Sequence, residues 1–105
     1  MVGKIGARAA VETAGRHGIP VLVAADSTKL LPLGFPQPVD DDRPASEVWA
    51  APPGVRVWNR YFEVVPGALV SALVTEDAVL DAAALDRKRA TLSVPAALLG
   101  WAAGR

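Results

Sequence analysis

The chain has 105 residues, of which 51% are hydrophobic and 21% are charged, and its 11 basic residues balance its 11 acidic ones. This composition predicts a single globular domain rather than a disordered segment. The balanced charge argues against a nucleic-acid-binding protein, because such proteins concentrate positive charge against phosphates.

The residue inventory excludes several kinds of site. Without a cysteine the sequence offers no disulfide, thiolate nucleophile or cysteine-bound metal, and a single histidine, His17, cannot build a metal cluster alone. Apolar runs fall short of the roughly 18 residues that a membrane span needs. The N-terminal residues lack the apolar core of a secretion signal. We therefore expect a cytoplasmic protein that binds no nucleic acid, membrane, metal or cofactor.

The first third of the sequence predicts a helix followed by a buried strand. Residues 3–17 are rich in alanine and glycine, which suits close packing against a sheet, and Gly18 and Pro20 mark the end of this helix. The unbroken apolar run in PVLVAAD is typical of a strand buried in a parallel sheet. A helix followed by such a strand indicates the α/β class.

The middle of the chain, residues 26–54, is expected to be irregular because of its many prolines. A loop of this length is uncommon in a compact domain and is usually functional or packed on a neighbour. Within it, ASEVWAAP predicts a helical turn that carries Trp49 inward. The acidic run at 40–42 is more typical of a solvated turn than of a metal site, since no second group of ligands accompanies it.

The last part of the sequence mixes strand and helix patterns. Residues 55–58 and 61–65 favour strands, whereas residues 66–76 are expected to form a helix with Pro66 in its first turn. One face of that helix would bury Leu69, Val70, Leu73 and Val74. Residues 81–89 predict a second helix, because an acidic residue stands at its start and basic residues at its end, as the helix dipole favours. The apolar PAALLGWAAG predicts a terminal helix that needs a surface to cover.

Two short motifs carry groups that suit an anion. ADSTK follows the buried strand, where ligands bind in open α/β sheets, and it offers Asp26, Ser27, Thr28 and Lys29. GKIG opens the first helix with Lys4 and Gly6, and the free amides of a helix N-terminus favour anions. The spacing of a phosphate-binding loop is missing. The structural alternatives are a capped turn with a surface lysine and an ordinary helix start.

The stretch from residue 60 to 76 contains two carboxylates, Glu63 and Glu76. Two carboxylates can serve in acid–base chemistry, but their spacing does not require it. A negative charge is unfavourable at the end of a helix, so we expect a salt bridge or a hydrogen bond to backbone to hold Glu76.

Three stretches, GKIG, HGIPVLVAADSTK and NRYFEVVPGALVSALVTE, follow one another in an order that resembles the carboxyl-terminal segment of the translation initiation factor 2B alpha/beta/delta family. That family includes isomerases of ribose bisphosphate and methylthioribose phosphate. The resemblance implies an α/β fold, a partial Rossmann-like three-layer domain with a mostly parallel sheet and C-terminal helices. Residues 1–80 would be the Rossmann-like segment and 81–105 a helical tail. The implied structural motif comprises Glu63, Pro66, Thr75 and Glu76.

The resemblance also implies which parts of an isomerase site the chain carries. Lys4 matches the lysine of an Asn-Lys pair that contacts substrate, while Gly3 stands in place of the asparagine. The cysteine and the aspartate that the isomerases use lie upstream of this segment. Val65 stands where many relatives have a helix-capping threonine, a loss of about 1 kcal/mol.

We therefore expect a non-catalytic module of this family that binds a phosphorylated sugar or nucleotide or docks on a partner. The alternative is a part of a sugar-phosphate isomerase that another chain or additional upstream sequence completes. A regulatory subunit of a nucleotide-exchange assembly is a third reading, which the alanine-rich composition disfavours. The apolar tail and the half-domain topology predict a homo-oligomer or a complex with a partner subunit.

Overall fold

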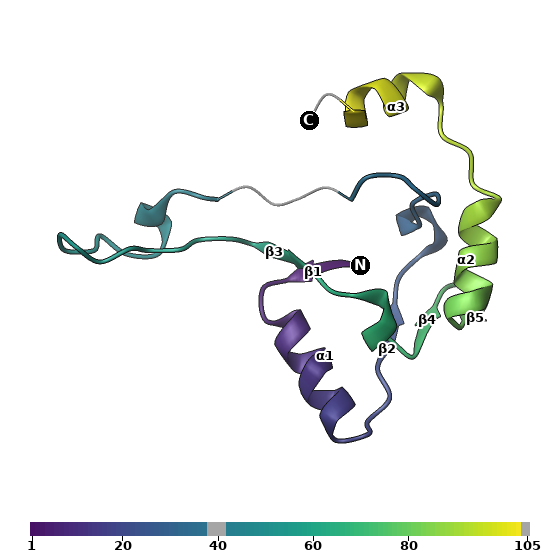
Figure 1. The fold of residues 1–105 in the computed structure, drawn as a ribbon, viewed down its shortest axis with the longest axis horizontal. Coiled ribbons are helices and arrows are strands. Elements are labelled where there is room, and N and C mark those ends of the chain that lie inside the picture. The colour runs from purple at the N-terminus through teal and green to yellow at the C-terminus, as the bar shows by residue number, and fades with distance from the viewer. Residues whose placement is uncertain (38–41, 104–105) are drawn as a thin grey trace.

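The computed structural model of the chain describes residues 1–37 and 42–103, with side chains described up to residue 100. Its elements form two small sheets flanked by helices (Figure 1). The first sheet pairs β1 (Val2–Lys4) with β3 (Phe62–Val64) in antiparallel fashion. The second sheet has the order β2 (Leu22–Ala24), β4 (Ala72–Val74) and β5 (Val79–Leu80). The predicted strand in PVLVAAD is therefore confirmed.

The first helix, α1 (Ala7–Arg16), begins later than residue 3, where the sequence predicted its start. Residues 2–4 form β1 instead, because pairing with β3 supplies the backbone hydrogen bonds that a helix would have supplied. Gly6, with φ of 99°, turns the chain from the strand into the helix. The expected close packing is present at Gly3, where an added Cβ would lie 3.0 Å from the Cβ of Ala7.

The predicted helix at residues 66–76 is wrong. Gly67–Leu69 forms a short 3₁₀ turn, η3, and the chain then enters β4, which runs parallel to β2. Val70 already has extended backbone, with φ of −103° and ψ of 129°. Leu73 in the middle of β4 is buried, so the apolar residues that suggested a helical face pack instead through a short strand.

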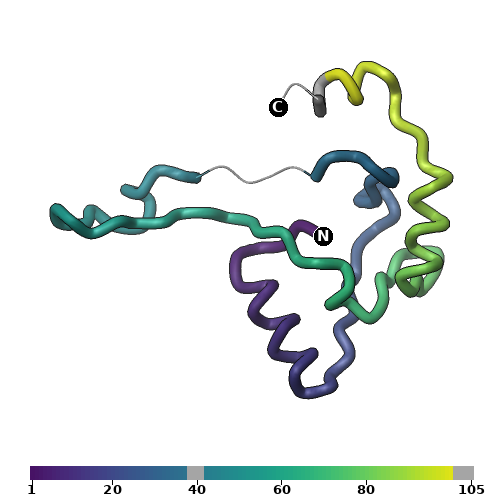
Figure 2. The backbone as a smooth tube through the Cα atoms, in the orientation of Figure 1, coloured from purple at the N-terminus to yellow at the C-terminus, as the bar shows by residue number. Residues whose placement is uncertain are grey.

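Residues 42–61 form an extended arm that projects from the rest of the chain, seen at the left of Figures 1 and 2. Its two limbs are joined by the backbone amide of Arg43, which donates to the carbonyl of Asn59 at 2.8 Å. The predicted helical turn is present as η2 (Ala45–Glu47). The strand predicted at residues 55–58 is wrong, because these residues pair with no neighbouring strand in the described part of the chain.

The inward orientation expected for Trp49 is also wrong. The Trp49 side chain is 56% exposed and that of Trp58 is 70% exposed. Both belong to the arm of residues 42–61, which extends away from the rest of the chain (Figure 2).

The C-terminal helices agree with the sequence. Helix α2 (Ala82–Ala90) begins after Asp81, whose carboxylate accepts a hydrogen bond from the amide of Ala84 at 2.8 Å. The side chain of Arg89 ties α2 to the first third of the chain by donating to the carbonyl of Leu31 at 2.8 Å. Helix α3 (Ala96–Ala103) follows. None of the helices among the described residues is long and apolar enough to cross a membrane.

The hydrophobic core is small. Among the described residues its buried side chains are Val11, Val65 and Leu73, and Val65 alone is fully buried. The radius of gyration is 17.0 Å, whereas a compact chain of this length has about 13 Å. Parallel pairing joins only β2 and β4, so the described sheets are not mostly parallel as expected. The result is a mixed α/β fold with an open shape and C-terminal helices.

Candidate functional site

The sheet of β1 and β3 places Lys4 beside two aromatic rings. In the antiparallel register Lys4 stands directly opposite Phe62, and its Nζ atom lies 4.4 Å from the centre of that ring. The same Nζ lies 5.0 Å from the centre of the Tyr61 ring. Both distances fall within the range of cation–π attraction. The Lys4 side chain is exposed, so its positive charge can meet a ligand from solvent.

The arm delivers further polar groups to Tyr61. The Tyr61 hydroxyl donates to Oε2 of Glu47 at 2.6 Å, and Nδ2 of Asn59 donates to the same oxygen at 2.9 Å. These two hydrogen bonds lower the pKa of Glu47. The guanidinium of Arg43 lies 4.9 Å from the centre of the Tyr61 ring. This cluster could not be predicted from the sequence, because no spacing rule connects residues from the two limbs of the arm.

Asn59, a buried residue between the two limbs of the arm, holds this cluster in place. It is only 8% exposed, and its side-chain amide also donates to the carbonyl of Pro44 at 3.0 Å. A buried amide with both hydrogen-bond partners in place is held in one orientation. Asn59 therefore connects the two limbs of the arm and orients Glu47.

At the GKIG motif, the amides that favour an anion are bound to a carboxylate of the chain itself. The backbone N–H groups of Gly6 and Arg8 both donate to Oε1 of Glu63, at 2.8 and 2.9 Å. A negative charge at a helix N-terminus is stabilised by these amides and by the helix dipole. Through these two hydrogen bonds Glu63 of β3 holds the start of α1.

At the ADSTK motif, a second carboxylate binds a distant amide. Ser27 begins the 3₁₀ turn η1 (Ser27–Lys29), and its N–H donates to the two carboxylate oxygens of Glu76 at 3.1 and 2.8 Å. The Ser27 hydroxyl also donates to Glu76. These bonds lower the pKa of Glu76, although the nearby charge of Asp26 acts in the opposite direction. The hydrogen bond to backbone expected for Glu76 is confirmed.

Asp26 caps the same turn. Its carboxylate accepts a hydrogen bond from the N–H of Thr28 at 3.1 Å and another from the Thr28 hydroxyl, and these bonds lower the pKa of Asp26. The donors of Ser27 and Thr28 are therefore engaged within the chain, next to two carboxylates. A ligand-binding role for these residues and for Lys29 stays a prediction. The two predicted anion motifs belong to different sheets, because Lys4 lies on β1, whereas Ser27 and Thr28 follow β2.

The remaining motif residues shape turns. Pro66 precedes η3, and Val65 before it is fully buried, so the residue in the place of the expected threonine contributes packing to the core. The Thr75 hydroxyl accepts from the amides of Asp77 and Ala78 at 3.3 and 3.1 Å. Thr75 thereby fixes the turn from β4 to β5.

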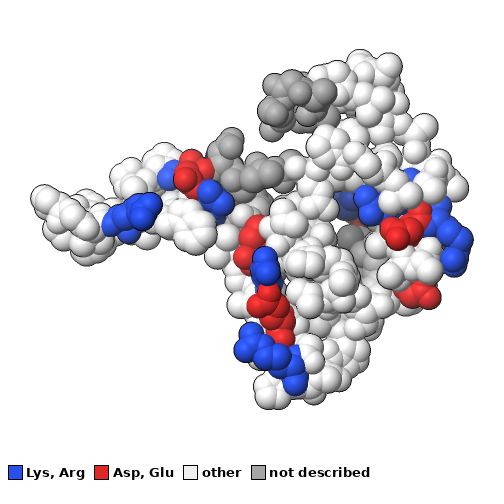
Figure 3. Space-filling view, viewed as in Figure 1, with Lys and Arg blue, Asp and Glu red and all other residues white. Residues whose placement is uncertain are grey.

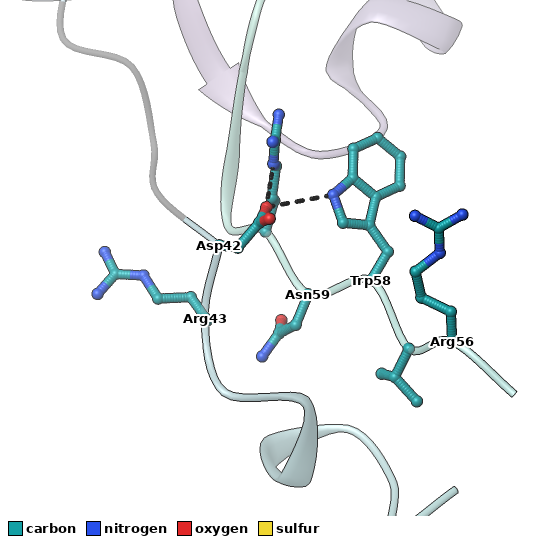
Figure 4. A pocket seen from close by; sticks show the side chains of 7 residues that line it. Asp42, Arg43, Arg56, Trp58 and Asn59 are labelled. Carbon is teal, nitrogen blue, oxygen red and sulfur yellow. Dashed lines mark hydrogen bonds and ion pairs between the residues drawn. The ribbon is translucent and has the colours of Figure 1, made fainter. Parts of the chain in front are cut away.

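The arm also contains a shallow hollow lined by charged and aromatic side chains (Figure 4). Oδ1 of Asp42 accepts from Nε1 of Trp58 at 3.3 Å and from Nε of Arg60 at 2.5 Å. Asp42 thus fastens the arm, while residues 40 and 41 of the acidic run lie outside the described residues. Among the described residues, no three His, Asp or Glu side chains group as a metal site requires. Figure 3 shows further charges along α1 and α2.

Comparison with known proteins places these motifs in context. No protein-family model matches the chain. In an alignment 86 residues long that covers 73% of the chain, it is 38% identical to a methylthioribose-1-phosphate isomerase of Oleidesulfovibrio alaskensis. The chain is thus similar to a part of this methylthioribose-1-phosphate isomerase. It is also 36% identical, over 99% of its length, to a probable bifunctional methylthioribose-1-phosphate isomerase/methylthioribulose-1-phosphate dehydratase of Nocardia farcinica.

A solved structure agrees with these isomerase relatives. The crystal structure of 5-methylthioribose 1-phosphate isomerase from Pyrococcus horikoshii OT3 matches 83% of the chain with a TM-score of 0.68 and 26% identity. The chain covers 26% of that structure, and 24% and 21% of the two curated relatives. It therefore spans about a quarter of the length of the isomerases that it matches. These relatives support the isomerase branch of the resemblance seen in the sequence, and none of the three bears the name of the translation factor.

Proposed function

We propose that the chain is the carboxyl-terminal α/β part of a sugar-phosphate isomerase that acts on methylthioribose 1-phosphate. In this proposal additional polypeptide completes a Rossmann-like three-layer fold and the active site. The observation that carries it is the match of 83% of the chain to about a quarter of an isomerase structure. The relatives favour this reading over the non-catalytic module that we expected first. We further propose that the protein is cytoplasmic, works without a cofactor, and assembles as a homo-oligomer or with a partner subunit.

The open fold supports the need for more polypeptide. Strand β2 lies at the edge of its sheet, and Leu22 on this strand is 64% exposed. An uncovered strand edge carries unpaired backbone donors and acceptors, to which a neighbouring strand can be added. The exposure of Ile19, 58%, just before β2 adds apolar surface to the same region. A further strand beside β2 would extend the second sheet and cover this surface.

The proton transfer that isomerisation requires also points to groups supplied by additional polypeptide. Aldose–ketose isomerisation moves a proton between neighbouring carbons and needs groups that accept and return it. The chain has no cysteine, and Glu63 and Glu76 already bind backbone amides. The lowered pKa of Glu76 makes it a weak base. In the proposal Lys4 binds the anionic substrate, while the proton-transfer groups come from the additional polypeptide.

Fragment complementation tests this function. The chain would be produced together with the first three quarters of the Oleidesulfovibrio alaskensis isomerase, and isomerisation of methylthioribose 1-phosphate would be measured. We expect no turnover from either part alone and measurable turnover from the mixture. The Lys4→Met variant of the chain should abolish the restored turnover.

The matched control is the last quarter of the relative itself, combined with the same N-terminal fragment. If that pair is active and the mixture with our chain is inactive, the isomerase proposal is wrong. Turnover by our chain alone would equally contradict it, because the chain would then need no additional polypeptide.

A further inference from the structure

We propose that Phe62 and Tyr61 position the Lys4 ammonium group for the anionic sugar phosphate, and that Glu47 of the arm holds Tyr61 in this arrangement. The inference rests on the proposed function, since it assigns positioning residues to the ligand-binding lysine. It also gives the arm a role in the site.

The strand register explains why Lys4 needs positioning. Pairing of β1 with β3 fixes the backbone of Lys4 opposite Phe62, but a lysine side chain carries its ammonium group on a flexible stem of four carbon atoms. The two aromatic rings, 4.4 and 5.0 Å from Nζ, restrict where the ammonium group lies. Restricting it before the ligand arrives reduces the entropy lost on binding.

A series of contacts connects the Lys4 ammonium group, through Tyr61 and Glu47, to the buried Asn59. Asn59, buried between the limbs of the arm, donates to Glu47, and Glu47 accepts from the Tyr61 hydroxyl at 2.6 Å. The Tyr61 ring in turn faces Lys4. The position of the ammonium group therefore depends on how the two limbs of the arm pack around Tyr61.

At the GKIG motif the helix amides already bind Glu63, so Lys4 is the group of this motif that we assign to anion binding. The N–H groups of Gly6 and Arg8 are bound to Glu63. An anion could bind those amides only by displacing the Glu63 carboxylate, whereas the Lys4 side chain is exposed to solvent.

The first readout is nuclear magnetic resonance of the lysine side chains in the 105-residue chain. The sequence contains three lysines, Lys4, Lys29 and Lys88, so their signals can be assigned by substitution. Ring currents should place the terminal methylene protons of Lys4 upfield of those of the other two lysines. We expect Phe62→Leu and Tyr61→Leu each to reduce this difference. The helical circular dichroism signal of the whole chain, to which α1, α2 and α3 contribute, checks that the variants remain folded.

The second readout is ligand affinity in the complemented isomerase, measured as the KM for methylthioribose 1-phosphate. Phe62→Leu and Tyr61→Leu should raise KM about three- to tenfold with a smaller change in kcat, as expected for loss of an exposed cation–π contact. Tyr61→Phe and Glu47→Ala each remove one end of the same hydrogen bond. They should therefore raise KM less than Tyr61→Leu. The double variant should be no worse than Glu47→Ala alone, which also removes an acceptor of the Asn59 amide.

The outcomes separate the inference from the function on which it rests. An inactive complemented enzyme would overturn the function, and the lysine signals would then decide the positioning alone. If the Lys4 signal is not shifted upfield in the wild type, the rings do not hold the ammonium group and the inference is wrong. It is also wrong if Lys4→Met abolishes turnover while both leucine variants keep the wild-type KM.

Discussion

Glu76 binds Ser27 across 49 residues of sequence, and its carboxylate accepts hydrogen bonds from both the backbone amide and the hydroxyl of that serine. Glu63 does the same for the amide of Gly6, across 57 residues. Glu76 thus joins the last third of the chain to the first third just after β2, and Glu63 joins the middle third to the first third at the start of α1. Both positions suit an anion, and at each of them the anion is supplied by the chain itself.

The contact between Glu76 and Ser27 predicts a specific pH dependence of stability. The pKa of Glu76 is lowered from its ordinary value of 4.5, so the folded state favours the ionised form. Its stabilisation is therefore present above about pH 4.5 and is lost as the pH falls through the lower pKa of the folded state. In urea unfolding, Glu76→Gln should lower stability at neutral pH and flatten the loss of stability in acid. Curves for wild type and variant that run parallel below pH 4.5 would contradict this.

Removing the Glu63 carboxylate should weaken α1. Glu63→Ala leaves the amides of Gly6 and Arg8 without this acceptor, and we expect a loss of about 1 kcal/mol in the free energy of unfolding. The helical circular dichroism signal should fall with it. Glu12→Ala is the control, because it removes an exposed ion pair with Arg8 on the same helix and should change stability little. Equal effects of the two substitutions would show that Glu63 does not cap the helix.

Two glycines should respond oppositely to alanine. Gly3→Ala would place a Cβ 3.0 Å from that of Ala7, and this overpacking should cost about 1–3 kcal/mol. Gly15→Ala, inside α1, meets no atom within 4 Å and should stabilise the chain by about 0.5–1 kcal/mol through helix propensity. Thermal unfolding of both variants measures the difference. A stabilising Gly3→Ala would mean that β1 and α1 lie further apart.

The cap of α2 can be tested independently. Asp81→Ala removes the acceptor for the Ala84 amide and should destabilise the chain by about 1 kcal/mol. Asp81→Asn keeps an oxygen acceptor and should retain most of that stability. If the asparagine variant is as unstable as the alanine variant in urea unfolding, the negative charge rather than the hydrogen bond holds the start of α2.

The sequence by itself determined the elements whose signals are local. The acid at the start and the bases at the end of residues 81–89 indicated α2, and the apolar run after Gly18 indicated β2. The spaced motifs, from GKIG to VTE, indicated a resemblance to the initiation factor 2B family, which includes sugar-phosphate isomerases, and Lys4 matched a lysine of that family. Such signals are readable because neighbouring residues create them.

Only the tertiary structure decided the rest. Residues 72–74 carry apolar side chains that suit a helix or a strand, and pairing with β2 made them β4. The spacing of Tyr61, Glu47 and Lys4 in the sequence does not predict that they form a cluster, because the fold of the arm brings them together. The partners of Glu63 and Glu76 were likewise decided by the fold, since a hydrogen bond across about fifty residues depends on where both ends of the chain lie in space.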